Sequence, residues 1–159
     1  IFGKSVPAWM LAVLLAAPAM ALVTVYATIS GDVTVNTPIS ASPTSWSSTT
    51  HYAGDPITKD FSVVNSANER DITVSFVGEI TDGDNNIESG EIEKVQLKAV
   101  TDEGDFEDCT VTISGGKASF DCGSNQIAHS TTEDFTLKVV FAPYADAKNY
   151  TITLNINPA

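Results

Sequence analysis

Short segments in which apolar and polar residues alternate follow one another through most of this 159-residue chain. Successive residues of a β-strand face opposite sides, so each segment predicts a strand with one buried face. Gly, Asn, Asp and Pro separate the segments and favour turns. No stretch after residue 30 shows the 3.6-residue period of an amphipathic helix. The pattern predicts an all-β fold, an antiparallel sandwich. The expected strands are 61–65, 71–77, 93–100, the two arms of 109–122, 134–141 and 149–156.

Both cysteines of the chain lie in one fourteen-residue stretch, CTVTISGGKASFDC. Gly115-Gly116 suits a two-residue hairpin turn, because both positions can adopt positive φ. That turn pairs Ser114 with Lys117 and brings Cys109 opposite Cys122 on the apolar face. Facing strand residues lie roughly 4.5–5.5 Å apart at Cα, within disulfide range. We predict a Cys109–Cys122 disulfide, with two reduced core thiols as the alternative. A disulfide indicates an oxidising compartment outside the cytoplasm.

The charge of the chain is strongly negative, with 8 Lys and Arg against 20 Asp and Glu. Nucleic acids and anionic lipids require a basic face, so neither is expected as a partner. The length allows one domain with its own core.

The N-terminal residues read in two ways. An uncharged apolar run, residues 5–31, follows Lys4 and contains Ala19-Met20-Ala21, which is typical of a secretory signal cleaved after Ala21. The alternative keeps this run as a bilayer anchor or a filament-core helix. We therefore expect three parts: an apolar leader (1–21), an assembly strand (22–36) and a β-sandwich domain (37–159).

Residues 22–36 alternate strictly and at unusual length for a strand. One reading is two consecutive strands with a bend at Gly31. The other is a projecting strand that completes the sheet of a neighbouring subunit through backbone hydrogen bonds. Such a contact is heterologous and leads to a filament. The apolar positions of the strand are Val23, Val25, Ala27, Ile29, Val33 and Val35.

Residues suited to catalysis are few. His51 and His129 are the two histidines, no H-E-x-x-H arrangement exists, and no third nitrogen or free thiol is available for zinc. Both histidines are expected in loops or turns, and the chain is not expected to be an enzyme.

An acidic loop, DGDNNIESGEIE (82–93), spaces its oxygen-bearing side chains as a calcium loop does. Ile87 stands where the EF-hand requires Gly, and the flanks predict strands, so the loop is not an EF-hand. It is either a solvated acidic turn or a structural calcium site, and no cofactor is required. The candidate ligands are Asp82, Asp84, Asn86, Glu88 and Glu93.

Asn149-Tyr150-Thr151 is the single N-x-[ST] sequon of the chain. In an exported protein Asn149 is a candidate for an N-glycan.

Two stretches of the chain, ATISGDVTVNTPISASPTSW and HYAGDPITKDFSVVNSANERDITVSF, resemble the camelysin/TasA family, which includes archaeal bundling-pilus subunits. The resemblance covers about residues 22–80. It implies a jelly-roll-like sandwich whose N-terminal strand, here Val23 to Val35, is donated to the next subunit of an extracellular filament. Some members have been described as metalloproteases, but this chain lacks the histidines for that activity.

The resulting prediction is a secreted subunit of a cell-surface filament of the pilus or biofilm type, a homopolymer joined by donor-strand complementation. Its partners would be copies of itself, and it would meet the membrane only during export. One alternative resembles the archaeal type IV pilins, with residues 1–30 as a helix in the filament core. Another is a surface adhesin domain anchored in the membrane.

Overall fold

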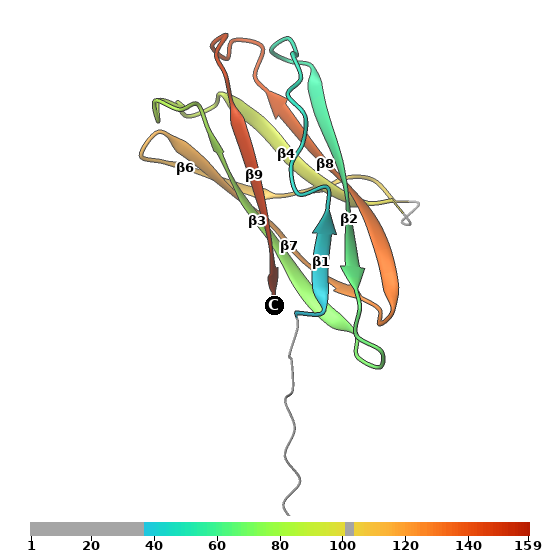
Figure 1. Cartoon of the computed structure of the whole chain (residues 1–159). Coiled ribbons are helices and arrows are strands. Elements are labelled where there is room, and N and C mark those ends of the chain that lie inside the picture. The colour runs from blue at the N-terminus through green and yellow to red at the C-terminus, as the bar shows by residue number, and fades with distance from the viewer. Residues whose placement is uncertain (1–36, 101–103) are drawn as a thin grey trace, which may run out of the picture. The chain divides into compact units, whose positions relative to one another are not determined.

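The computed structural model describes residues 37–100 and 104–159. The predicted leader and assembly strand lie outside the described residues. The described part is an all-β sandwich of two antiparallel sheets, as the alternating pattern predicts (Figure 1). Within it no helix is long and apolar enough to cross a membrane.

One sheet has five strands in the order β1-β2-β8-β4-β5. Every pairing in this sheet is antiparallel. Its centre is β8, whose register runs from Pro56↔Val140 to Asn65↔Thr131 against β2. The strands are β1 (Ile39–Ser42), β2 (Pro56–Asn65), β4 (Ile92–Ala99), β5 (Glu107–Asp108) and β8 (Thr131–Phe141).

The second sheet has four strands in the order β6-β7-β3-β9. Strand β3 lies between β7 and β9, and β9 pairs with β3 from Thr81↔Thr151 to Val74↔Pro158. Strand β9 therefore forms an edge of this sheet. The strands are β3 (Ile72–Thr81), β6 (Thr110–Ser114), β7 (Lys117–Ile127) and β9 (Thr151–Pro158).

The core lies between the two sheets and consists of the inward-facing apolar residues that the alternation predicts. Phe76 and Phe135, on opposite sheets, are each 1% exposed and pack with ring centroids 4.8 Å apart. Phe61 stacks on Phe135 at 5.4 Å. Buried Asn65 ties the sheets together, because its amide donates to the carbonyl of Ile127 at 3.0 Å.

The disulfide hairpin has the predicted register, with Ser114 opposite Lys117. Gly115 and Gly116 have φ of +59° and +73°, which suits glycine in a tight turn. Cys109 and Cys122 form the predicted disulfide. The two cysteines are half-buried rather than fully buried, because β6 is an edge strand of its sheet.

The Ser/Thr/Pro-rich residues 37–50, which are absent from the expected strands, contain one short strand. Ile39–Ser42 form β1, which pairs with the end of β2. The chain continues as irregular residues 43–53, named here the strap, which run beside the first half of β2. Strand β5 lies in the acidic stretch before Cys109, where no strand was expected.

Candidate functional site

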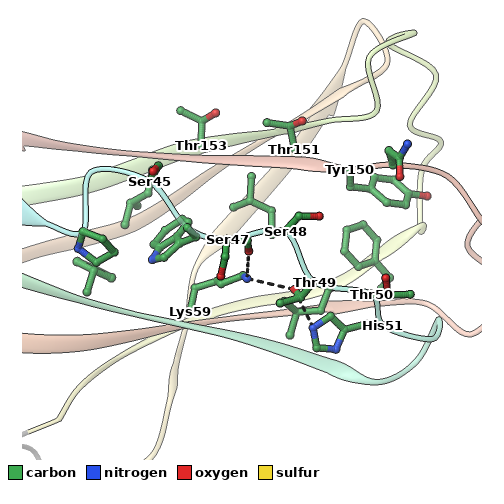
Figure 2. A pocket seen from close by; sticks show the side chains of 18 of the residues that line it. Ser45, Ser47, Ser48, Thr49, Thr50, His51, Lys59, Tyr150, Thr151 and Thr153 are labelled. Carbon is green, nitrogen blue, oxygen red and sulfur yellow. Dashed lines mark hydrogen bonds between the residues drawn. The ribbon is translucent and has the colours of Figure 1, made fainter.

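A groove of about 1210 Å³ lies between β9 and the strap. One wall is β9, and the other comprises the strap with the face of β2 behind it (Figure 2). We name this hollow the acceptor groove. Ser and Thr residues of the strap line part of it, and its large apolar lining residues include Trp46, Ile57, Phe61, Phe141, Ile152, Leu154 and Ile156.

Strand β9 presents an unpaired edge to the acceptor groove. It is hydrogen-bonded to β3 on one side, and no strand of the described residues pairs with its other side. Its inward-facing Ile152, Leu154 and Ile156 are only half-buried, although the alternation predicted an inward apolar face. An edge of this kind offers backbone donors and acceptors to an added strand.

From Thr151 to Asn157 the edge of β9 lacks the residues that usually prevent strand addition. This span carries no charged residue, in a chain with 28 charged side chains (8 basic and 20 acidic). Natural edge strands are commonly protected by Lys, Pro or inward-pointing charges. In β9 the single such residue is Pro158, at the end of the strand. Thr151 and Thr153 point away from the strap (Figure 2).

The strap is held against β2 by side chains rather than by strand pairing. Trp46 donates its indole N–H to the carbonyl of Asp60 at 2.9 Å and packs edge-on against Phe61 at 6.2 Å. Lys59 donates to the carbonyl of Ser47 at 3.0 Å and to Thr49 Oγ1 at 3.1 Å (Figure 2). The strap covers part of β2 and leaves the edge of β9 open.

Lys59 is a residue of this site that the sequence analysis missed. It lies on the same face of β2 as Ile57 and Phe61, the face that points toward the other sheet. The signal was in the sequence, because residues 57–61 alternate and place a lysine between two apolar residues. Its ammonium donates hydrogen bonds to a backbone carbonyl and to a hydroxyl of the strap.

Four of the five calcium candidates lie around one smaller hollow of about 540 Å³, namely Asp82, Asp84, Asn86 and Glu88. Glu93 is exposed on β4 and does not line this hollow. Among residues 37–100 and 104–159 no group of three or more His, Cys, Asp or Glu side chains is arranged to hold a metal ion. The calcium site stays a prediction.

A cation of the protein itself lies in this region. The Lys148 ammonium is 2.9 Å from Asp82 Oδ2 and 3.4 Å from Glu91 Oε1, and both carboxylates are buried, at 1% and 7% exposed. The hydrogen bond from Lys148 lowers the pKa of Asp82, and the bond to Asp82 raises the pKa of Lys148. We name Lys148, Asp82, Glu91 and Tyr150 the ion cluster.

Glu91 is the central acceptor of the ion cluster. It accepts hydrogen bonds from the backbone N–H of Glu88 and of Asp146, and from the hydroxyl of Tyr150 at 3.0 Å. Burial works to raise the pKa of Glu91, but these bonds together with Lys148 hold it below its ordinary value. Burial and the bond to Glu91 raise the pKa of Tyr150 to about 12.

The remaining candidates lie apart from the acceptor groove or at its ends. Asn149 is exposed just before β9, so glycosylation there stays a prediction. His129 lies in the turn before β8 and bonds Asp71 at 2.8 Å, and His51 lies in the strap, so both are outside strands as expected. The apolar residues of the predicted assembly strand lie outside the described residues.

Comparisons with known proteins identify no relative by sequence. No protein family and no curated protein matches the chain. A family 123 glycoside hydrolase from Clostridium perfringens, studied for glycolipid glycan hydrolysis, is similar in structure at 13% identity and a TM-score of 0.43. The similarity covers 68% of this chain and 19% of the hydrolase. AvmM, which catalyses macrocyclization in alchivemycin A biosynthesis, is similar at 8% identity and a TM-score of 0.43, over 77% of this chain and 89% of AvmM.

Proposed function

We propose that this protein is the structural subunit of an extracellular filament, in which residues 22–36 of one copy lie as a strand in the acceptor groove of the next. The observation that carries the proposal is the uncharged edge of β9, which no strand of the described residues pairs and whose apolar side chains are half-buried beside the acceptor groove. A strand added there would gain backbone hydrogen bonds and would cover the apolar side chains of β9.

The segment 22–36 suits this groove in length and pattern. Strand β9 has eight residues and points Ile152, Leu154 and Ile156 inward at a spacing of two. The segment alternates over a longer stretch and carries Val25, Ala27 and Ile29 at the same spacing. Each large apolar side chain that becomes buried contributes roughly 1.5–3 kcal/mol.

Donation to a neighbouring copy gives an open polymer. The donor segment and the acceptor groove are different surfaces of the chain, so the contact is heterologous and repeats without closing. The disulfide supports a place outside the cytoplasm, since such bonds persist in oxidising compartments. These features together favour a cell-surface fibre built of one kind of subunit.

A mixing experiment with the full chain tests this assembly. Ile29→Asp should disable the donor, because it buries a charge without a partner, and Leu154→Asp should disable the acceptor groove for the same reason. Each variant alone should stay monomeric. An equimolar mixture should give a heterodimer that cannot extend, because one donor and one groove remain intact.

Matched controls place a charge on the opposite face of each strand. Thr28 and Thr153 alternate with the apolar positions of their segments. Thr28→Asp and Thr153→Asp should therefore still form filaments, as observed by electron microscopy. Normal filaments from Ile29→Asp would overturn donor-strand assembly. If Leu14→Asp, in the leader, were the single variant that abolished filaments, a pilin with a helical filament core would replace donor-strand assembly. A wild-type chain that stays monomeric at every concentration would favour the anchored adhesin.

A further inference from the structure

The ion cluster joins two loops at one end of the sandwich. Asp82 follows β3 directly, and Lys148 lies three residues before β9, which pairs with β3. The amine and the carboxyl are in contact at 2.9 Å, and a second buried carboxylate, Glu91, lies 3.4 Å from the same nitrogen. The amine, the carboxyl and a nearby proton acceptor are the groups that form an amide.

We propose that Lys148 and Asp82 condense to an intramolecular amide, a covalent cross-link between the start of β9 and the end of β3. This inference goes beyond the proposed function and does not depend on it.

The backbone around Asp82 suits a carboxyl that is attacked. Its Oδ1 accepts hydrogen bonds from the N–H of Asp84 at 3.2 Å and of Asn86 at 3.1 Å, while Oδ2 faces Lys148. The N–H of Asn86 also reaches Oδ2, at 3.2 Å. Two preorganised N–H donors on Oδ1 would stabilise the negative charge that develops on this oxygen when the amine adds to the carbon.

Glu91 is placed to move the protons. The resting pair is ionised, so the ammonium must lose a proton before it attacks. Glu91 Oε1 accepts a proton from Nζ and passes it to Oδ2, and a second proton follows as the carbon–Oδ2 bond breaks. The Nζ–Cγ bond forms, Oδ2 leaves as water with two protons of the ammonium, and Glu91 ends unchanged. One positive and one negative charge are lost together.

The cluster has one apolar, aromatic side and one polar side, where Lys148 also donates to the carbonyl of Asn86 at 3.3 Å and lies 3.9 Å from Asp146 Oδ2. Ile87 and Phe141 are 3% and 5% exposed, and Phe141 packs on Tyr150 with ring centroids 4.3 Å apart. Burial alone disfavours the charged forms of Asp82 and Lys148, but the hydrogen bond between them outweighs burial and keeps the resting pair ionised, so proton transfer through Glu91 must precede attack. The cross-link would fix β9 in place, and β9 forms a wall of the acceptor groove.

Peptide mapping of the folded, full-length chain tests the cross-link. Trypsin cuts after Arg70, Lys94, Lys138 and an unmodified Lys148. We expect residues 71–94 joined to residues 139–159, uncut after Lys148, at the summed mass less one water. The linked pair is decisive, whereas intact mass alone is not, because Asp82-Gly83 can also lose water by closing to a succinimide.

Three variants separate the cross-link from a simple ion pair. Lys148→Arg keeps the positive charge but should abolish the linked peptide. Glu91→Gln should reduce the yield of the linked peptide at least tenfold, measured in chains whose disulfide has formed. Lys117→Arg alters the exposed Lys117–Glu79 pair and should leave the yield unchanged. Separate peptides 71–94 and 139–148 from folded wild-type protein, after prolonged incubation, would overturn the proposal. An undiminished yield from Glu91→Gln would remove Glu91 from the reaction.

Discussion

Glu91 shows how much a single buried side chain can hold together in this fold. Its carboxylate accepts bonds from residues of both loops that flank the ion cluster, and it is 5% exposed. The spacing of the acidic loop indicated Glu88 and Glu93 among the candidate ligands but did not indicate Glu91. The spacing of a calcium loop does not show which carboxylate a neighbouring loop will cover.

The pH dependence of stability should reveal this role. The folded-state pKa of Glu91 is below its ordinary value of 4.5, so its contribution is present above pH 4.5 and is lost as the pH falls through the folded-state pKa. Glu91→Gln should lower the free energy of unfolding by about 2 kcal/mol near neutral pH. Urea unfolding across an acid pH series should show the two proteins converging below pH 4.5.

The control for Glu91 is Glu88→Gln, because the Glu88 side chain is exposed and Glu88 contacts the cluster through its backbone N–H and carbonyl. It should follow the wild type at every pH. A constant difference between wild type and Glu91→Gln at all pH values would assign the loss to packing rather than to the ionised carboxylate.

Elements were predicted well where alternation and turn residues agree. The hairpin register followed from Gly115-Gly116 and the cysteines alone. Strand β1 was missed because ISAS is short and lies among Ser, Thr and Pro. Its pairing with β2 depends on tertiary structure, which the local sequence does not show. The half-buried face of β9 was also missed, because alternation shows which face is apolar but not whether another strand covers it.

The hairpin turn and the acidic loop after β3 should depend on each other. The N–H of Ile87 donates to the carbonyl of Gly116 at 3.0 Å, and a Cβ on Gly116 would collide with the backbone carbonyl of Asn85. Gly116→Ala should therefore lower the free energy of unfolding by about 3 kcal/mol, from positive φ plus the collision. Gly115→Ala has the same sign of φ but open space around it, and should cost about 1 kcal/mol.

Urea unfolding of both glycine variants gives the comparison. Both variants replace glycine by alanine in the same turn. The difference between their free energies of unfolding therefore isolates the contact with the acidic loop. Equal losses would mean that the hairpin and this loop are not in contact in solution.

At the scale of the whole molecule, the sequence predicted the sandwich, whereas the acceptor groove could not be predicted from it. The groove exists because one sheet ends at β9 while the strap occupies the edge of the other, and neither fact is local. What the sequence does provide is the charge, a formal net of −12. Copies that assemble must bring this charge together, while the edge where they would meet is uncharged.

Assembly should therefore depend on salt in a defined direction. Like-charged subunits repel over a distance set by the Debye length, about 10 Å at 0.1 M ionic strength and longer in dilute buffer. Raising sodium chloride from a few millimolar to physiological strength should speed filament growth roughly tenfold, measured by light scattering.

Calcium and magnesium chloride at equal ionic strength separate screening from binding. If filaments grow faster in calcium chloride than in magnesium chloride, the acidic loop binds calcium specifically. Equal growth rates in the two salts would indicate that screening is the cause. A growth rate that falls as sodium chloride is added would mean that attraction between charged surfaces, rather than burial of an uncharged strand, drives the contact.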